Sequence, residues 1–90
     1  MNSKESKTFA AEIRKEMPEL DLHGLFPEEI NNRVDLFLYE NYKNKEASVK
    51  IIYGIGKGVL RKEVLSFLQN HPLVDKIINK EGSCLVLLVD

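Results

Sequence analysis

Strand signals and helix signals alternate along this chain, and this alternation restricts it to an architecture in which helices pack on a sheet. Residues 20–23 alternate apolar and polar side chains and end at Gly24, which predicts a short strand. Apolar residues then recur at helical spacing from Pro27, a residue suited to the first helical position, to about Tyr42. The first half of the chain therefore predicts one strand followed by one helix.

The second half repeats this order. Residues 49–53 form a β-branched segment that runs into a glycine loop at 54–58, and a second helical pattern follows. Residues 73–78 and 83–89 predict two more strands around a Glu81-Gly82 turn. We therefore predict a β-α-β-α-β-β order, an α/β (α+β) two-layer domain with a mixed sheet. Each strand–helix–strand unit is expected to pair in parallel through a right-handed crossover, and the last two strands to form an antiparallel hairpin.

A short amphipathic helix is predicted before this domain. Phe9, Ile13 and Met17 follow one another at steps of four, which places them on one face of a helix over residues 8–17. Pro18 is expected to end the helix, since proline disfavours helical geometry in the preceding residue. We expect this arm to pack on the domain through its apolar face.

Length fits a single domain, with 90 residues divided into a polar tail and helical arm (1–18) and the α/β domain (19–90). The first residues, 1–7, are polar, so fraying is expected there and no signal peptide is visible. The longest apolar run, 84–89, is far short of the ~20 residues that span a bilayer. One cysteine, Cys84, excludes a disulfide framework and favours a reducing, cytoplasmic setting, with a buried thiol in the last strand.

Charge is balanced overall but unevenly distributed. Thirteen basic and 14 acidic residues give a net charge of −1, which argues against a protein coated with basic residues for bulk DNA binding. Residues 20–46 sum to −3, whereas residues 47–71 sum to +3, with Glu63 as the one acid of the latter segment. The basic residues of that segment are Lys50, Lys57, Arg61 and Lys62. The distribution predicts one local anion site.

Asp21 and His23 form the first candidate site. Side chains alternate faces along a strand, so both should point away from the core. A carboxylate beside an imidazole can fix the ring tautomer and support general acid or base chemistry. Alternatively, Asp21 caps the following turn and His23 packs against Pro27. Metal binding has little support, because these two are the one pair of residues that could share an ion.

The glycine loop is the second candidate. Gly54, Gly56 and Gly58 allow a close backbone approach at the start of a helix, where amide groups and the helix dipole favour an anion. Lys57 adds a mobile positive charge, and Arg61 follows one turn later. The spacing matches neither the nucleoside-triphosphate P-loop nor a full dinucleotide fingerprint. A plain strand-to-helix turn with solvated lysines is the alternative interpretation.

The positions of the Asp21/His23 motif and the glycine loop in the predicted sheet support a functional role for both. Each follows the carboxyl end of a strand, and ligands bind beyond such ends in open parallel sheets. If the two strands are neighbours, about 4.8 Å apart, His23 and the glycine loop converge on one patch.

Three motifs together resemble the small MutS-related (Smr) domain: L-D-L-H-G at 20–24, G-I-G-K-G at 54–58, and H-P-L-V at 71–74. The resemblance covers about 19–90 and suggests the stand-alone form of this domain. It implies a fold similar to the C-terminal domain of the bacterial translation initiation factor three. It also implies binding of DNA or RNA and, in many members, endonuclease activity.

The family's functional positions match Asp21 and His23 as a catalytic pair and Gly54, Gly56 and Lys57 as nucleic-acid-binding residues. We add Tyr53, Gly58 and Arg61 to the predicted binding set. Tyr53 is a departure, because the family usually has His or Thr there, and a phenol of pKa ~10 is a poor base. Binding is therefore better supported than cleavage. No cofactor is required by the sequence, although a divalent metal is compatible with nuclease chemistry. No membrane partner is expected.

Two alternatives remain open at this stage. One is a DNA- or RNA-binding module without catalysis. The other is a protein-interaction domain that uses the N-terminal helix and the Tyr39 and Tyr42 side chains. His71, before Pro72, is expected only to lie at a helix end near the last carbonyls.

Overall fold

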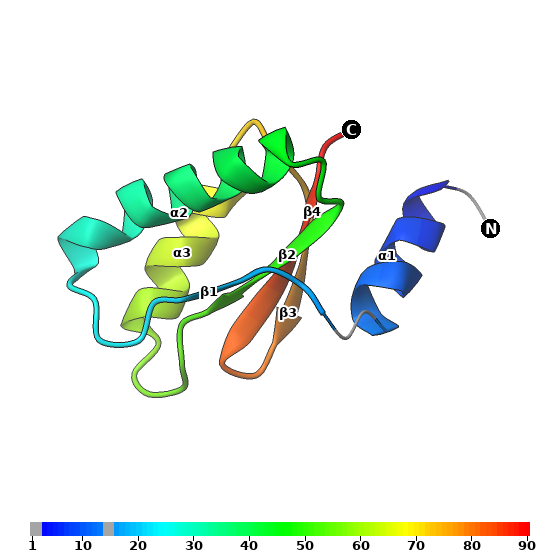
Figure 1. Ribbon diagram of the computed structural model, residues 1–90. Helices are drawn as coiled ribbons and strands as arrows, with labels where there is room; N and C mark the ends of the chain where they lie inside the picture. Colours follow the sequence, from blue (N-terminus) through cyan, green and yellow to red (C-terminus); the bar gives the residue numbers. More distant parts are fainter. Residues whose placement is uncertain (1–2, 14–15) are drawn as a thin grey trace.

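A four-stranded mixed sheet lies at the centre of the protein in the computed structural model, which describes residues 3–13 and 16–90 (Figure 1). The elements are α1 (Ser3–Ile13), β1 (Glu19–Asp21), α2 (Pro27–Lys43), β2 (Ser48–Ile52), α3 (Val59–Gln69), β3 (Val74–Lys80) and β4 (Ser83–Leu88). This order confirms the predicted succession of strands and helices. Within the described residues, no helix is long and apolar enough to cross a membrane.

The strand order in the sheet is β1-β2-β4-β3. β1 pairs in parallel with β2, and β3 and β4 form the predicted antiparallel hairpin. The expectation that β2 and β3 pair in parallel across α3 is wrong, because β4 lies between them and is antiparallel to both. All six residues of β4 are buried, so the most apolar strand takes an interior position where both of its faces are covered.

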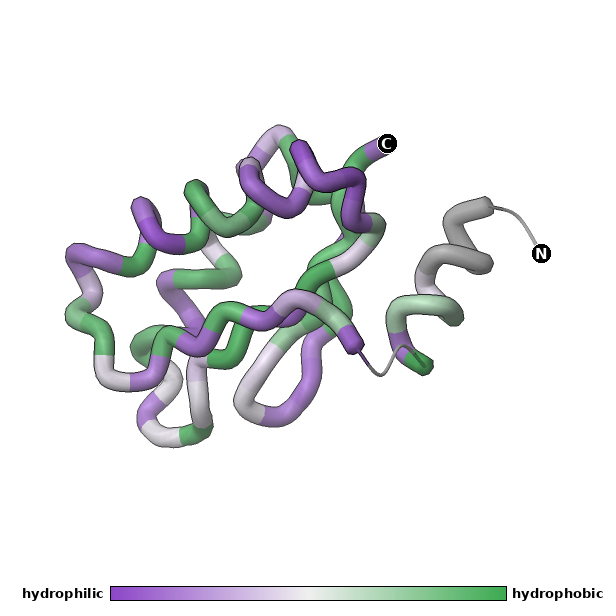
Figure 2. The backbone as a smooth tube through the Cα atoms, in the orientation of Figure 1, coloured by the Kyte–Doolittle hydropathy of each residue, from purple (hydrophilic) through white to green (hydrophobic). Residues whose placement is uncertain are grey.

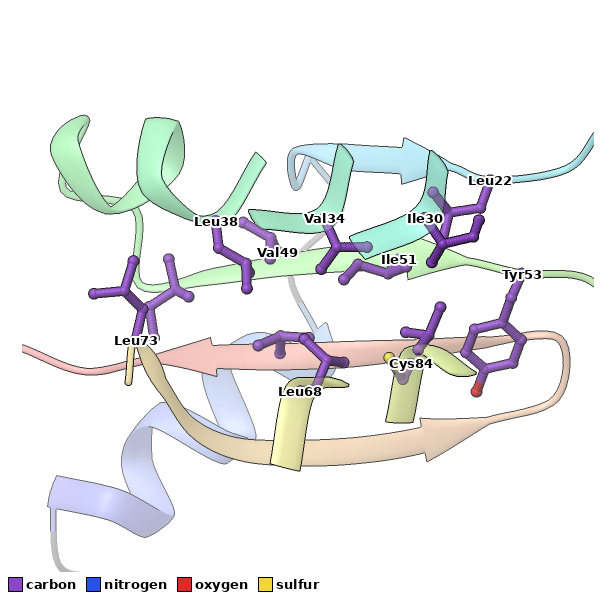
Figure 3. Close-up of a cluster of buried hydrophobic side chains, with 13 residues drawn as sticks. Leu22, Ile30, Val34, Leu38, Val49, Ile51, Tyr53, Leu68, Leu73 and Cys84 are labelled. Carbon is purple, nitrogen blue, oxygen red and sulfur yellow. The ribbon is translucent and has the colours of Figure 1, made fainter. Parts of the chain in front are cut away.

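Helices α2 and α3 cover one face of the sheet (Figure 1). Along α2, hydrophobic and hydrophilic residues alternate at helical spacing (Figure 2). Its apolar face, Ile30, Val34 and Leu38, packs with inward-facing residues of the strands (Figure 3). The buried cluster is completed by Leu22, Val49, Ile51, Tyr53, Val64, Leu68, Leu73, Cys84, Val86 and Leu88. This core fixes the ends of β1 and β2, where both candidate motifs begin.

Helix α1 packs on the opposite face of the sheet, but through a different side from the one predicted. Ala11 is buried against Leu85 and Leu87 of β4, whereas Phe9 and Ile13 are 59% and 62% exposed. A small side chain lets the helix approach β4 closely, and residues two apart on a helix lie on roughly opposite sides. The two large apolar residues therefore face outward.

The boundaries of α1 also differ from the prediction. The helix begins at Ser3, within the segment that was expected to fray, and ends at Ile13, well before Pro18. Met17 nevertheless packs against the small cluster under α1, as the prediction placed it against the domain. The first two residues and residues 14–15, which the predicted arm includes, lie outside the described part of the chain.

Candidate nucleic-acid interface

The turn after β1 is built by a side chain that bonds to the backbone. The N–H of Leu22 donates to the carbonyl of Ile52 at 2.8 Å, so pairing with β2 continues one residue past the strand. Leu22 is fully buried, while Asp21 and His23 are exposed, as alternation predicts. Asp21 Oδ1 accepts a hydrogen bond from the N–H of His23 at 2.9 Å. The carboxylate thus caps the turn, which confirms one part of the alternative interpretation, while the packing of His23 against Pro27 stays a prediction.

The start of α2 fixes the far side of this turn. The N–H of Phe26 donates to Glu29 Oε2 at 2.9 Å, and the N–H of Glu29 donates to the carbonyl of Phe26 at the same distance. Pro27 occupies the first helical position, where its missing N–H leaves no helical bond unmade. These contacts hold the exposed segment that carries His23 between a strand and a helix start.

The glycine loop is anchored to the β3–β4 turn. The carbonyl of Gly82 accepts hydrogen bonds from the N–H groups of Tyr53 and Gly54, at 3.1 and 2.9 Å. A Cβ added to Gly82 would lie 3.4 Å from Ile55 Cγ1, so the turn and the loop are in close contact. Gly56, at φ 106°, has a backbone conformation that L side chains rarely adopt. The Glu81-Gly82 pair predicted a turn, but no local signal in the sequence indicates that Gly82 holds the glycine loop.

Three backbone amides remain for an anion at the start of α3. The N–H of Lys62 makes a bond to the carbonyl of Gly58 at 3.0 Å, so the preceding amides, residues 59–61, have no acceptor within the helix. The helix dipole adds positive potential at this end. The N–H of Gly54, a predicted nucleic-acid-binding residue, donates to the carbonyl of Gly82, so the amides that the helix itself leaves without an acceptor are those at residues 59–61.

One cleft brings the two candidate motifs together. It has a volume of about 310 Å³ and lies between the turn after β1 and the glycine loop. Its lining consists of His23, Tyr53, Gly54, Ile55, Lys57, Gly58, Val59, Leu60 and Arg61. The predicted convergence of His23 and the glycine loop is therefore confirmed. Of the predicted site, Asp21 and Gly56 are not among the described residues that line the cleft.

Tyr53 contributes to the wall of this cleft from inside the core. The side chain lies among the buried hydrophobic residues and is only 3% exposed (Figure 3). Its hydroxyl donates to the carbonyl of Ser83 at 2.8 Å. Burial raises the pKa of Tyr53 above its usual 10.0, and nearby Cys84 adds to this, while the Arg61 guanidinium acts in the opposite direction. The phenol is thus neutral, bonded within the domain and unsuited to act as a base.

His71 and Cys84 are not among the residues that line this cleft, and both are buried. His71 is 8% exposed and ends α3 as predicted, but its ring also contacts Asp35 of α2, a long-range partner that local sequence does not reveal. Cys84 is fully buried, as predicted, and burial raises the pKa of its thiol to about 12. Among residues 3–13 and 16–90, no three His, Cys, Asp or Glu side chains form a group that could hold a metal ion.

Fold and site together define a small α+β domain with a cleft at the carboxyl ends of two parallel strands, lined by His23, Lys57 and Arg61. The family model described as "Smr domain" matches residues 20–88, and the chain therefore belongs to the Smr domain family. This agrees with the resemblance carried by the three sequence motifs.

Curated relatives of the chain carry the name "Endonuclease MutS2". The chain is 39% identical over 64 residues to the protein of Clostridium botulinum (strain Loch Maree / Type A3), and 36% identical over 74 residues to that of Thermomicrobium roseum. These alignments cover 71% and 77% of this chain but only 8% and 9% of the relatives. The chain thus corresponds to a small part of much longer proteins.

Two solved structures share the fold. The Smr domain of Thermus thermophilus MutS2 superposes with a TM-score of 0.78 at 25% identity, covering 82% of this chain and 100% of that one. YdaL, a stand-alone small MutS-related protein from Escherichia coli, superposes with a TM-score of 0.84 at 19% identity, covering 99% of this chain and 79% of that one. The second comparison spans nearly the whole chain, α1 included.

Proposed function

We propose that this chain binds the sugar–phosphate backbone of nucleic acid in the cleft between the turn after β1 and the glycine loop. The observation that carries the proposal is the convergence of His23, Lys57 and Arg61 on one cleft at the start of α3. Unsatisfied amides, a helix dipole and two cationic side chains all favour a phosphate there. The names of the MutS2 relatives support a nucleic-acid ligand.

Within this site, His23 is our candidate for the general base of phosphodiester cleavage. Its imidazole would accept a proton from the attacking nucleophile, a water molecule or a ribose 2′-hydroxyl, while the oxygen attacks phosphorus. Lys57 would stabilise the negative charge that develops on the phosphoryl oxygens. Asp21 acts as a positioning residue, because its carboxylate holds the backbone of His23.

A second candidate function is binding without cleavage. It is favoured by Tyr53, which stands where related domains usually have His or Thr and whose hydroxyl is bonded to Ser83 inside the domain. If that position takes part in cleavage, this chain has lost a reactive group and keeps only the phosphate site.

Cleavage assays distinguish a nuclease from a module that binds without cleavage. Labelled single- and double-stranded DNA and RNA are incubated with the protein, with and without Mg²⁺ or Mn²⁺, and the variants His23→Ala and Asp21→Ala are compared with it. The nuclease proposal expects cutting that His23→Ala abolishes. Cutting that persists in His23→Ala points to a contaminant, and no cutting on any substrate removes the catalytic part.

Binding is tested independently through its salt dependence. Each phosphate that the protein neutralises releases counterions, so the binding constant falls as salt is added. With two cationic side chains and the helix start, a plot of log binding constant against log salt concentration should have a slope of roughly −1.5 to −2 for a single strand. The double change Lys57→Glu/Arg61→Glu should abolish binding. Lys43→Glu, at the exposed end of α2, serves as the control. Binding that resists the double change would contradict the proposal.

A further inference from the structure

A second depression adjoins the candidate cleft along α3. It has a volume of about 470 Å³ and is lined by Lys57, Gly58, Arg61, Lys62, Leu65, Ser66 and Gln69. Lys57, Gly58 and Arg61 line both depressions. The two depressions are therefore adjacent, with these three residues between them.

Charge divides α3 into two sides. Neither of the two adjacent depressions has an acidic residue in its lining, whereas Lys57, Arg61 and Lys62 all contribute to them. Glu63, the one acid of α3, instead lines a groove between α2 and α3 together with Asp35 and His71, and this groove meets the second depression only at Ser66. The side of α3 that continues from the cleft thus presents positive charge followed by polar groups.

The length of this track exceeds what one phosphate needs. The 11 residues of α3 rise about 16 Å along the helix axis. Phosphates of one strand advance roughly 3.4 Å per nucleotide along a duplex. A single strand can be more extended than this, so roughly two to five consecutive phosphates fit between the glycine loop and Gln69.

We propose that the ligand is a polynucleotide chain whose backbone runs from the cleft along this side of α3, and that Lys62 and Gln69 bind phosphates beyond the cleft. This rests on the proposed function. Lys62 supplies an ammonium group and Gln69 two amide N–H donors, both suited to phosphate oxygens. A mononucleotide or a lone terminal phosphate would occupy the cleft alone and leave these residues without contacts.

The test is a length series. Fluorescence anisotropy measures the affinity of the full chain for oligo-dT and oligo-U from about two to about twelve nucleotides, a range typical of single-strand sites. Affinity should rise with length up to about five nucleotides and then level off. The variant Lys62→Ala/Gln69→Ala should bind the longest oligomer several-fold more weakly, with a salt slope shallower by about 0.7. Its affinity for the dinucleotide should be unchanged.

The control is Asn32→Ala/Lys43→Ala, which removes an amide and an ammonium group from the exposed side of α2. It should behave as the unaltered protein, and circular dichroism checks that both double variants are folded. If the protein binds long oligomers through Lys57 and Arg61 but Lys62→Ala/Gln69→Ala has no length-dependent effect, this inference is overturned and the proposed function stands. If the unaltered protein binds no oligomer of any length, the proposed function fails with it.

Discussion

Nε2 of His71, at the end of α3, lies 2.8 Å from Oδ1 of Asp35, in the middle of α2. The other ring nitrogen, Nδ1, accepts a hydrogen bond from the N–H of Leu73 at 3.1 Å, so the neutral ring carries its proton on Nε2. Tyr39 and Phe67 contact the ring edge-on. This single side chain thus joins the two covering helices to the start of β3.

Removing His71 should therefore destabilise the domain more than removing its partner. His71→Ala leaves a cavity and an unsatisfied Leu73 N–H, with an expected loss of about 2 kcal/mol of unfolding free energy. Asp35→Ala should lose about 0.5 kcal/mol, because the carboxylate is 46% exposed and water can replace it. Urea denaturation measures both, and equal losses would contradict this account.

Asp21 offers a test of how the candidate site is held. An asparagine side-chain oxygen can accept the same backbone bond from the N–H of His23, whereas alanine cannot. Asp21→Asn should therefore keep nucleic-acid binding within about twofold and Asp21→Ala should weaken it, through loss of a cap worth about 1 kcal/mol. If Asp21→Asn is as impaired as Asp21→Ala, the negative charge, and not the cap, is what matters. Fluorescence anisotropy titrations of a labelled oligonucleotide measure the affinity of both variants.

Cys84 predicts a loss of stability at alkaline pH. Its pKa is raised in the folded state from 9.0 to about 12, since burial disfavours the thiolate. The stability that the protonated Cys84 thiol contributes is fully present below pH 9.0 and is lost as the pH rises through about 12. Between these values the thiol releases its proton readily only in the unfolded chain, which favours unfolding. Cys84→Ala should show a flatter stability–pH curve there. In native protein near neutral pH, the thiol should also resist alkylation until denaturant is added.

Tyr53→Phe separates the structural role of this residue from its predicted binding role. The substitution removes the 2.8 Å hydrogen bond to the buried carbonyl of Ser83 and should lower the unfolding free energy by about 1 kcal/mol. Because the hydroxyl is bonded inside the domain, nucleic-acid affinity should change by no more than the small effect of losing its interaction with Arg61. A large loss of affinity with normal stability would show that Tyr53 contacts the ligand directly.

The two sides of α1 should differ in their sensitivity to substitution. Ala11→Glu would place a charge against Leu85 and Leu87 and should release the helix from β4, with a loss of at least 1 kcal/mol. Phe9→Ser, on the exposed side, should change stability by less than about 0.5 kcal/mol. Hydrogen exchange of the α1 amides detects release of the helix. If Phe9→Ser is the more damaging change, the orientation of α1 is not as described.

Local sequence predicted much of the site and of the core. Alternation along residues 20–23 predicted that Leu22 is buried and that His23 is exposed, and glycine spacing located the loop before α3. The prediction for α1 was wrong because apolar periodicity identifies an amphipathic face but not the surface it meets. At β4 the available partners favoured Ala11 over the larger Phe9 and Ile13.

The sequence by itself determined the succession of strands and helices and the buried faces of β1, α2 and α3, since periodicity and backbone sterics act over a few residues. Tertiary structure alone decided that β4 lies between β2 and β3, that Gly82 anchors the loop at Gly54, and that His71 bonds to Asp35. The β2–β4 pairing, the bond between Gly54 and Gly82 and the contact of His71 with Asp35 each join residues 28 or more positions apart, so each depends on how the whole core packs.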